Sequence, residues 1–180
     1  SYCIAEGCRY TRNKARYFGS VFACGAVCVI AFLPFGSFYG NALITLSMSI
    51  LLLYGMEAWK SSGKLRFLAL TAALAAVFYL LCRTVYIDYG FAGVLLPVYA
   101  AAGRLLWERV FVGIPPVIGE RLGFAVGLLA LASVMGGVQR FCVLAIFPIL
   151  LLGNERGKWK MKHFFYLYYP SHLAVIGAVQ

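Results

Sequence analysis

The chain has 180 residues, of which 63% are hydrophobic and only 12% are charged, and its mean hydropathy is +0.85. A soluble domain carries about 25% charged residues, so a water-soluble globule of this length could not bury so much apolar surface, and lipid must surround most of it. The net charge of +10 could suit nucleic acid, but the Lys and Arg residues stand in short clusters between apolar runs. That arrangement is typical of multi-spanning membrane proteins and argues against nucleic-acid binding.

Seven apolar runs follow the first basic cluster. They cover residues 17–38, 41–58, 65–87, 90–107, 122–138 and 140–152 and the stretch after Lys162. A span needs about 20 apolar residues; the fifth and sixth runs are shorter and could form a tilted or broken pair. All must be helical, because lipid-facing backbone has no other way to satisfy its hydrogen bonds. The sequence therefore predicts a single all-α transmembrane domain over residues 1–180, with about seven transmembrane helices.

The chain begins with Ser, and its first residues (SYCIAEG) resemble the end of an apolar segment. We therefore expect that the natural chain starts further upstream and that residues 1–7 close a truncated N-terminal helix.

The positive charges follow the predicted topology. The loops at 9–16, 57–66, 104–121 and 153–162 carry 14 of the 16 Lys and Arg residues, and the alternate loops carry the other two. The positive-inside rule then places these four loops in the cytoplasm and the C-terminus outside.

His172 is the first candidate for chemistry. It lies ten residues past Lys162, about 15 Å along a helix and so near mid-depth in a hydrocarbon core of about 30 Å. Pro170 removes a backbone donor just before it. The imidazole could act as a general base in a cavity, or it could simply bond to a neighbouring helix; spacing alone does not separate the two.

Asp88 and Glu6 are the other candidate catalytic residues. Asp88 precedes a Tyr-Gly turn signal, and its simplest role is to end a helix and pair with Arg83. Glu6 could likewise pair with Arg9 or Arg12. Asn41 stands at the head of the second run, where we expect a helix N-cap.

The basic loops have two interpretations. They could be topology signals that also touch anionic lipid headgroups. Alternatively, one cluster could hold the phosphates of a cytosolic donor, for which Arg12, Lys158 and Lys162 are best placed.

The tyrosines at 166, 168 and 169 suit an interfacial aromatic belt. The six cysteines form no C-x-x-C pair and suit small apolar filler within helices; we predict no metal site.

Several stretches resemble the TraX family of bacterial membrane proteins, named after the conjugation-system protein that N-acetylates the pilin subunit. They are EGCRYTRNKARY, GNALITLSMSILLLY, DYGFAGVLLPV, LLGNERG and KHFFYLYYPSHLAVI, and they follow the family's order over nearly the whole chain. The resemblance implies a bacterial inner-membrane protein that transfers acetyl from acetyl-CoA to an amine or hydroxyl acceptor. Most family members are not linked to pili, so the acceptor is not carried over, and a pilin-like protein and a glycan are both candidates. TraX-like chains usually carry an upstream helix ending in Asp-His, in keeping with a truncated N-terminus here.

Carried over by position, the residues that fall on the family's recurrent polar positions are Glu6, Arg12, Asp88, Tyr169 and His172, and Asn154 and Lys162 fall in the matching cytoplasmic loop. We expect Glu6, Asp88 and His172 to form the catalytic set. The donor-binding set would be Arg12, Asn154, Lys162 and Tyr169, together with Lys158, which is chosen for its place in the basic loop. Two alternatives stay open beside the acetyltransferase. A non-catalytic membrane assembly protein would be favoured if the natural chain began near Ser1. A small transporter would use Asp88, Arg83 and His172 as a polar route, without binding CoA.

Overall fold

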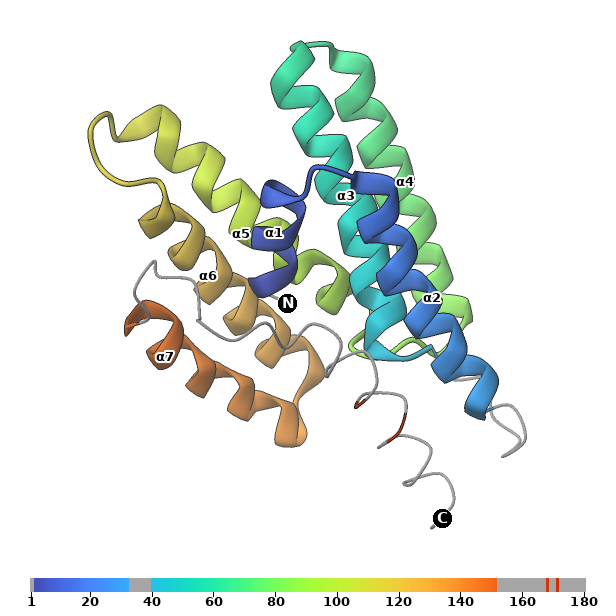
Figure 1. Ribbon diagram of the computed structural model, residues 1–180. Coiled ribbons are helices and arrows are strands. Elements are labelled where there is room, and N and C mark those ends of the chain that lie inside the picture. Colours follow the sequence, from blue (N-terminus) through green and yellow to red (C-terminus); the bar gives the residue numbers. More distant parts are fainter. Residues whose placement is uncertain (1, 33–39, 152–167, 169–170, 172–180) are drawn as a thin grey trace.

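The computed structural model describes residues 2–32, 40–151, 168 and 171. The helices are α1 (Tyr2–Tyr10), α2 (Lys14–Phe32), α3 (Ala42–Ser62), α4 (Leu65–Thr84), α5 (Gly90–Val110), α6 (Val117–Met135), the 3-10 helix η2 (Gly137–Ala145) and α7 (Ile146–Leu151). They pack as a bundle in which α1 lies between the α3–α4 hairpin and the α5–α6 hairpin (Figure 1). The predicted all-helical membrane bundle is confirmed.

Four helices, α3 to α6, are long and apolar enough to cross a membrane, and the apolar stretch Arg140–Leu151 is shorter. α4 packs on its neighbours with few side chains: in its apolar window only 6% of the residues are buried. Leu70 and Leu80 on this helix are 63% and 62% exposed. An apolar face this open needs lipid around it, because in water it would be an aggregation surface.

The helices extend further into the basic segments than the sequence pattern predicts. Residues 104–121 were expected to form a loop, but α5 continues to Val110 and α6 already begins at Val117. Pro116 caps the start of α6, a place where proline is tolerated because the first helical amides need no partner. The Pro-Pro pair therefore starts a helix here, and it brings Glu120 and Arg121 into the first turns of α6.

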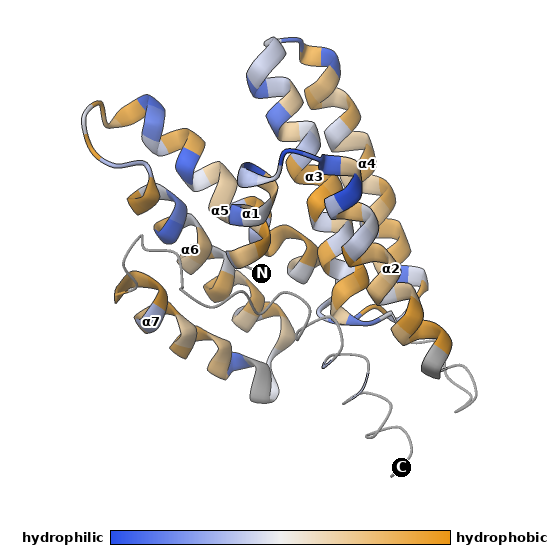
Figure 2. Cartoon of the chain, in the orientation of Figure 1, coloured by the Kyte–Doolittle hydropathy of each residue, from blue (hydrophilic) through white to orange (hydrophobic). Residues whose placement is uncertain are grey.

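Three connections lie toward the same end of the bundle, which we call the basic end: the α1–α2 turn (residues 11–13), the α3–α4 turn (63–64) and the α5–α6 loop (111–116). Ion pairs join the helices next to these connections. Lys14 Nζ lies 2.7 Å from Glu57 Oε2, and Lys60 Nζ lies 2.6 Å from Glu108 Oε2. Figure 2 shows hydrophilic residues at the α1–α2 and α3–α4 turns and on the neighbouring ends of α5 and α6, whereas the α5–α6 loop and the helix centres are mostly apolar. The fourth predicted basic loop, 153–162, lies outside the described residues.

The opposite end is closed by contacts between the segments that flank α3 and α5. The amide of Gly40 donates to the carbonyl of Tyr86 (3.0 Å), and the amide of Asp88 donates to the carbonyl of Gly40 (2.6 Å). Thr45 Oγ1 donates to the carbonyl of Asp88 at 2.6 Å. These contacts fix the α2–α3 and α4–α5 connections at the end away from the basic end. The cytoplasmic placement of the basic segments stays a prediction.

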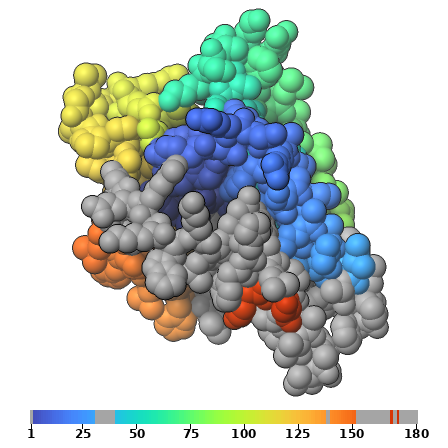
Figure 3. Space-filling view, in the orientation of Figure 1, coloured from blue at the N-terminus to red at the C-terminus, as the bar shows by residue number. Residues whose placement is uncertain are grey.

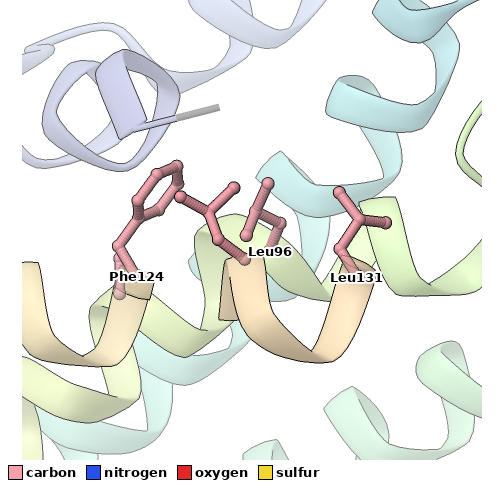
Figure 4. Packing of buried hydrophobic residues seen from close by; sticks show 5 residues of the cluster. Leu96, Phe124 and Leu131 are labelled. Atoms are coloured by element: carbon pink, nitrogen blue, oxygen red, sulfur yellow. The ribbon is translucent and has the colours of Figure 1, made fainter. Parts of the chain in front are cut away.

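The core lies where α5 and α6 face α1. Leu96 and Ala100 from α5 pack with Phe124, Leu128 and Leu131 from α6, and Figure 4 shows the side chains of Leu96, Phe124 and Leu131 lying side by side in this cluster. The ring of Tyr2 on α1 meets Phe124 edge-on, with centroids 5.4 Å apart. All six cysteines lie in helical elements, and Cys8 and Cys28 are buried.

Asn41 is the N-cap of α3, as predicted. Its Oδ1 accepts from the amides of Leu43 (2.9 Å) and Ile44 (3.3 Å), and its Nδ2 donates to the carbonyl of Gly25 in α2 (2.8 Å).

We expect Asn41→Ala to lower the free energy of unfolding by about 2 kcal/mol, because the cap is lost and the buried Gly25 carbonyl loses a donor. Asn13→Ala is the matched control: Asn13 caps the amide of Arg16 at 2.9 Å on an exposed turn, and its loss should cost about 0.5 kcal/mol. Equal losses by denaturant titration in micelles would contradict the buried role of Asn41.

Candidate functional site

A buried carboxylate cross-links three helices at the basic end. Glu120, in the first turns of α6, is 3% exposed. Its Oε2 accepts from Arg9 Nη1 on α1 at 3.2 Å and from Arg104 Nη1 on α5 at 3.1 Å. Two guanidinium groups thus converge on one oxygen of Glu120.

The ion pairs continue outward from Glu120 on both sides. Arg9 Nη2 lies 2.9 Å from Glu6 Oε1, and Arg104 Nε donates to Glu108 Oε1 at 3.0 Å. The second oxygen of Glu108 is the partner of Lys60 on α3. We call the whole set the charge network: Glu6, Arg9, Glu120, Arg104, Glu108 and Lys60. It holds three acids and three bases, so each charge drawn away from water has an opposite charge beside it.

The small residues of α5 and α6 make this convergence possible. Gly103 on α5 faces Gly119 and Gly123 on α6, and a Cβ on Gly103 would lie 2.7 Å from the Gly123 Cα. Glycines at i and i+4 let two helix backbones approach closely, a common packing mode in membranes. Arg104 directly follows Gly103, and Glu120 directly follows Gly119. The two charged residues therefore meet because the helix backbones are in contact at these glycines.

A pocket of about 230 Å³ opens beside the charge network, between α1, α3, α5 and α6. Its polar lining is Arg9, Glu57, Lys60, Arg104 and Glu120, and its apolar lining includes Ala5, Leu53, Met56, Ala101 and Leu105. Pockets for whole drug-sized ligands are usually larger. This one therefore suits the narrow end of a ligand, with an apolar stem against the leucines and an oxygen-rich group against the guanidiniums.

Two titratable groups on α1 line the pocket, Cys8 and Arg9. Burial would lower the pKa of the Arg9 guanidinium, but Glu6 and Glu120 more than offset this and the pKa is raised. Arg9 is therefore a permanent cation. Burial, reinforced by Glu57 and opposed by Lys14, raises the pKa of Cys8 to about 12, so this pocket thiol is protonated at neutral pH and is a poor nucleophile.

The structure brings some of the sequence-predicted site residues together and separates others. Glu6 belongs to the charge network and pairs with Arg9, and Arg12 is exposed on the α1–α2 turn of the same end. Asp88 lies at the opposite end, where its backbone joins Gly40 to Thr45. The remaining predicted residues lie outside the described residues: His172, Asn154, Lys158, Lys162 and Tyr169.

Sequence reasoning missed Glu120 and its two arginine partners. Glu120 is separated from Arg9 by 111 positions and from Arg104 by 16, so spacing gave no hint of the pairs. A signal was nevertheless present. The chain has only six acidic residues, and one of them stands between Gly119 and Gly123 just after a Pro-Pro start, where an ionisable group in a spanning helix marks a functional site by default.

The TraX protein family matches residues 2–180, nearly the whole chain. The chain belongs to the TraX family. Searches of curated proteins and of solved structures found no match. Family membership and the four apolar helices together make this a TraX-family membrane protein that is embedded in lipid.

Proposed function

We propose that this TraX-family protein is an acetyltransferase of the bacterial inner membrane that takes acetyl from acetyl-CoA at the basic end. The acceptor would be an amine or a hydroxyl on a pilin-like protein or a glycan. The observation that carries the proposal is the convergence of Arg9, Arg104 and Lys60 on one pocket with an apolar wall. Such a pocket suits a thioester on an uncharged arm, and acetyl transfer is the activity that the resemblance to the TraX family implies.

In the proposed reaction the acceptor nitrogen or oxygen attacks the carbonyl carbon of the thioester. The C–S bond breaks, the acetyl group stays on the acceptor, and CoA leaves as a thiolate that takes up a proton. The guanidinium of Arg104 or Arg9 would stabilise the negative charge that develops on the carbonyl oxygen, because preorganised donors in a dry site act strongly there. We keep His172 as the proposed base for the acceptor proton and Glu6 as the residue that holds Arg9; we assign Asp88 no part in this step.

The donor's phosphates would stay outside the pocket, on the cytoplasmic side where acetyl-CoA is present. Arg12 lies on the exposed turn of the basic end. We expect it to act with Asn154, Lys158, Lys162 and Tyr169, the donor-binding set predicted from the sequence, since Lys and Arg near phosphate form charge-assisted hydrogen bonds.

Acetyl-CoA binding to the protein in lipid nanodiscs, measured by calorimetry, tests the proposal. We expect Arg104→Gln to weaken binding at least tenfold, because it removes a charged donor worth roughly 1.5–3 kcal/mol. Lys60→Gln, whose side chain is 51% exposed, should weaken binding without affecting the fold. Arg83→Gln, an exposed cation at the opposite end, is the matched control and should bind like the unmodified protein. Binding unaffected by the Arg104 and Lys60 changes, or no binding at all, would contradict the proposal.

A further inference from the structure

A second, wider pocket adjoins the first one on the outer side of the charge network. Its volume is about 470 Å³, and its lining is Trp59, Lys60, Gly63, Leu105, Glu108 and Arg109. Lys60 and Leu105 line both pockets. The two are therefore neighbours across one lysine and one leucine, and a single elongated ligand could occupy both.

An aromatic face and a cation stand together in this outer pocket. The guanidinium carbon of Arg109, on the last turn of α5, lies 5.7 Å from the ring centre of Trp59 on α3. The Trp59 carbonyl accepts the amide of Gly63 at 2.8 Å, where Gly63 ends α3 in the left-handed conformation (φ 64°). This C-cap orders the turn that carries the indole.

The charged residues of the outer pocket differ in whether they already have an oppositely charged partner. Glu108 is shared between Lys60 and Arg104, whereas Arg109 forms no ion pair with any residue that the structure describes. Arg109 is exposed and its described contact is with the Trp59 ring, so it can reach an anion without breaking an ion pair. Lys60 needs only to share its ammonium group, which has three donors.

We infer that the outer pocket binds the nucleotide portion of the acetyl donor, with the adenine stacked on the face of Trp59 that Arg109 does not cover and a phosphate held by Arg109 and Lys60. The inference rests on the proposed function, because the inner pocket would then hold the thioester end of the same molecule. Aromatic faces stack on any base, and arginine adds both charge and a planar donor set for phosphate. Lipid headgroup phosphate shares this chemistry, so the test must separate the two sources.

The direct test measures binding of adenosine 3′,5′-bisphosphate to the whole protein in phosphatidylcholine nanodiscs. Trp59→Ala and Arg109→Gln should each weaken binding about tenfold, in line with the loss of one stacked base or one charge-assisted contact. Trp59→Phe, which keeps an aromatic face, should restore most of the affinity, and Arg83→Gln should leave it unchanged. The inference is overturned if the bisphosphate does not bind or if Trp59→Ala leaves its affinity unchanged. It is also overturned if phosphatidylglycerol in the nanodisc displaces the bisphosphate.

A second arm distinguishes this inference from the proposed function. Acetyl-CoA and the shortened donor S-acetylpantetheine are compared in a turnover assay that follows free thiol. Trp59→Ala should raise KM for acetyl-CoA about tenfold and leave kinetics with S-acetylpantetheine unchanged, since only the former carries a nucleotide. Turnover of both donors with no effect of Trp59→Ala would reject the nucleotide pocket alone. Bisphosphate binding that depends on Trp59, with no turnover of either donor, would reject the acetyltransferase alone.

Discussion

Replacing Glu120 with Gln is expected to lower the free energy of unfolding by about 3 kcal/mol, the lower end of the cost of breaking a buried ion pair. The carboxylate is 3% exposed and compensates two guanidiniums at once. Without its charge, Arg9 and Arg104 remain partly buried, at 28% and 23% side-chain exposure, next to a neutral amide. Unfolding with sodium dodecyl sulfate in mixed micelles, followed by circular dichroism, measures the loss.

Glu57→Gln is the matched control for this prediction. Glu57 pairs with Lys14 at 2.7 Å, but the two side chains are 46% and 44% exposed. Solvent screens such a pair, so its removal should cost less than about 1 kcal/mol. Similar losses for the two variants would mean that the charge network contributes no more than a surface ion pair, and the central place given to Glu120 would then be wrong.

Replacing Gly123 with Leu should prevent the α5–α6 hairpin from forming. A Cβ at this position would collide with the Tyr99 carbonyl oxygen and would lie 2.9 Å from the Gly103 Cα. Backbone atoms cannot rotate away as side chains can, so the helices must separate. Even Gly123→Ala should cost about 2 kcal/mol, in the range of overpacked cores, and should also weaken acetyl-CoA binding, because Arg104 moves away from Glu120.

Gly19→Ala provides the comparison for Gly123→Ala. Gly19 is also inside a helix, but nothing lies within 4 Å of a Cβ built there. Its replacement should stabilise α2 by up to about 1 kcal/mol through helix propensity alone. The same micelle titration, together with calorimetric acetyl-CoA binding, measures both variants. A Gly123→Ala protein that folds and binds like Gly19→Ala would show that the helices do not need close approach.

The fold was largely predictable from the sequence because lipid imposes strong constraints. Apolar runs of span length must be helical, and basic clusters mark one side. The first expectation agrees with the four apolar helices α3 to α6, and the second agrees with the ion pairs gathered toward the basic end. The Asn41 cap was also predictable, since its preference is local. The start of α6 was misplaced by five residues because the Pro-Pro pair was interpreted as a break, although proline is equally a helix-start residue.

The candidate site was only partly predictable. Glu6 was identified, but its network was not, because the partners come from α1, α3, α5 and α6 and their pairing depends on how these helices cross. Figure 3 shows α1 packed into the middle of one face, next to α2. This position, which delivers Arg9 to Glu120, follows from the burial of Tyr2, Ala5 and Cys8 against the other helices.

The sequence by itself determined that the chain is a helical membrane protein, which family it resembles, and that its positive charge belongs to one side. These properties follow from composition and local order, to which lipid and the membrane interface respond directly. Only the tertiary structure decided that Glu120 lies between Arg9 and Arg104 beside a pocket. The reason is steric: glycines on α5 and α6 let the two backbones touch and bring Arg104 to Glu120, and the packing of α1 against these helices adds Arg9.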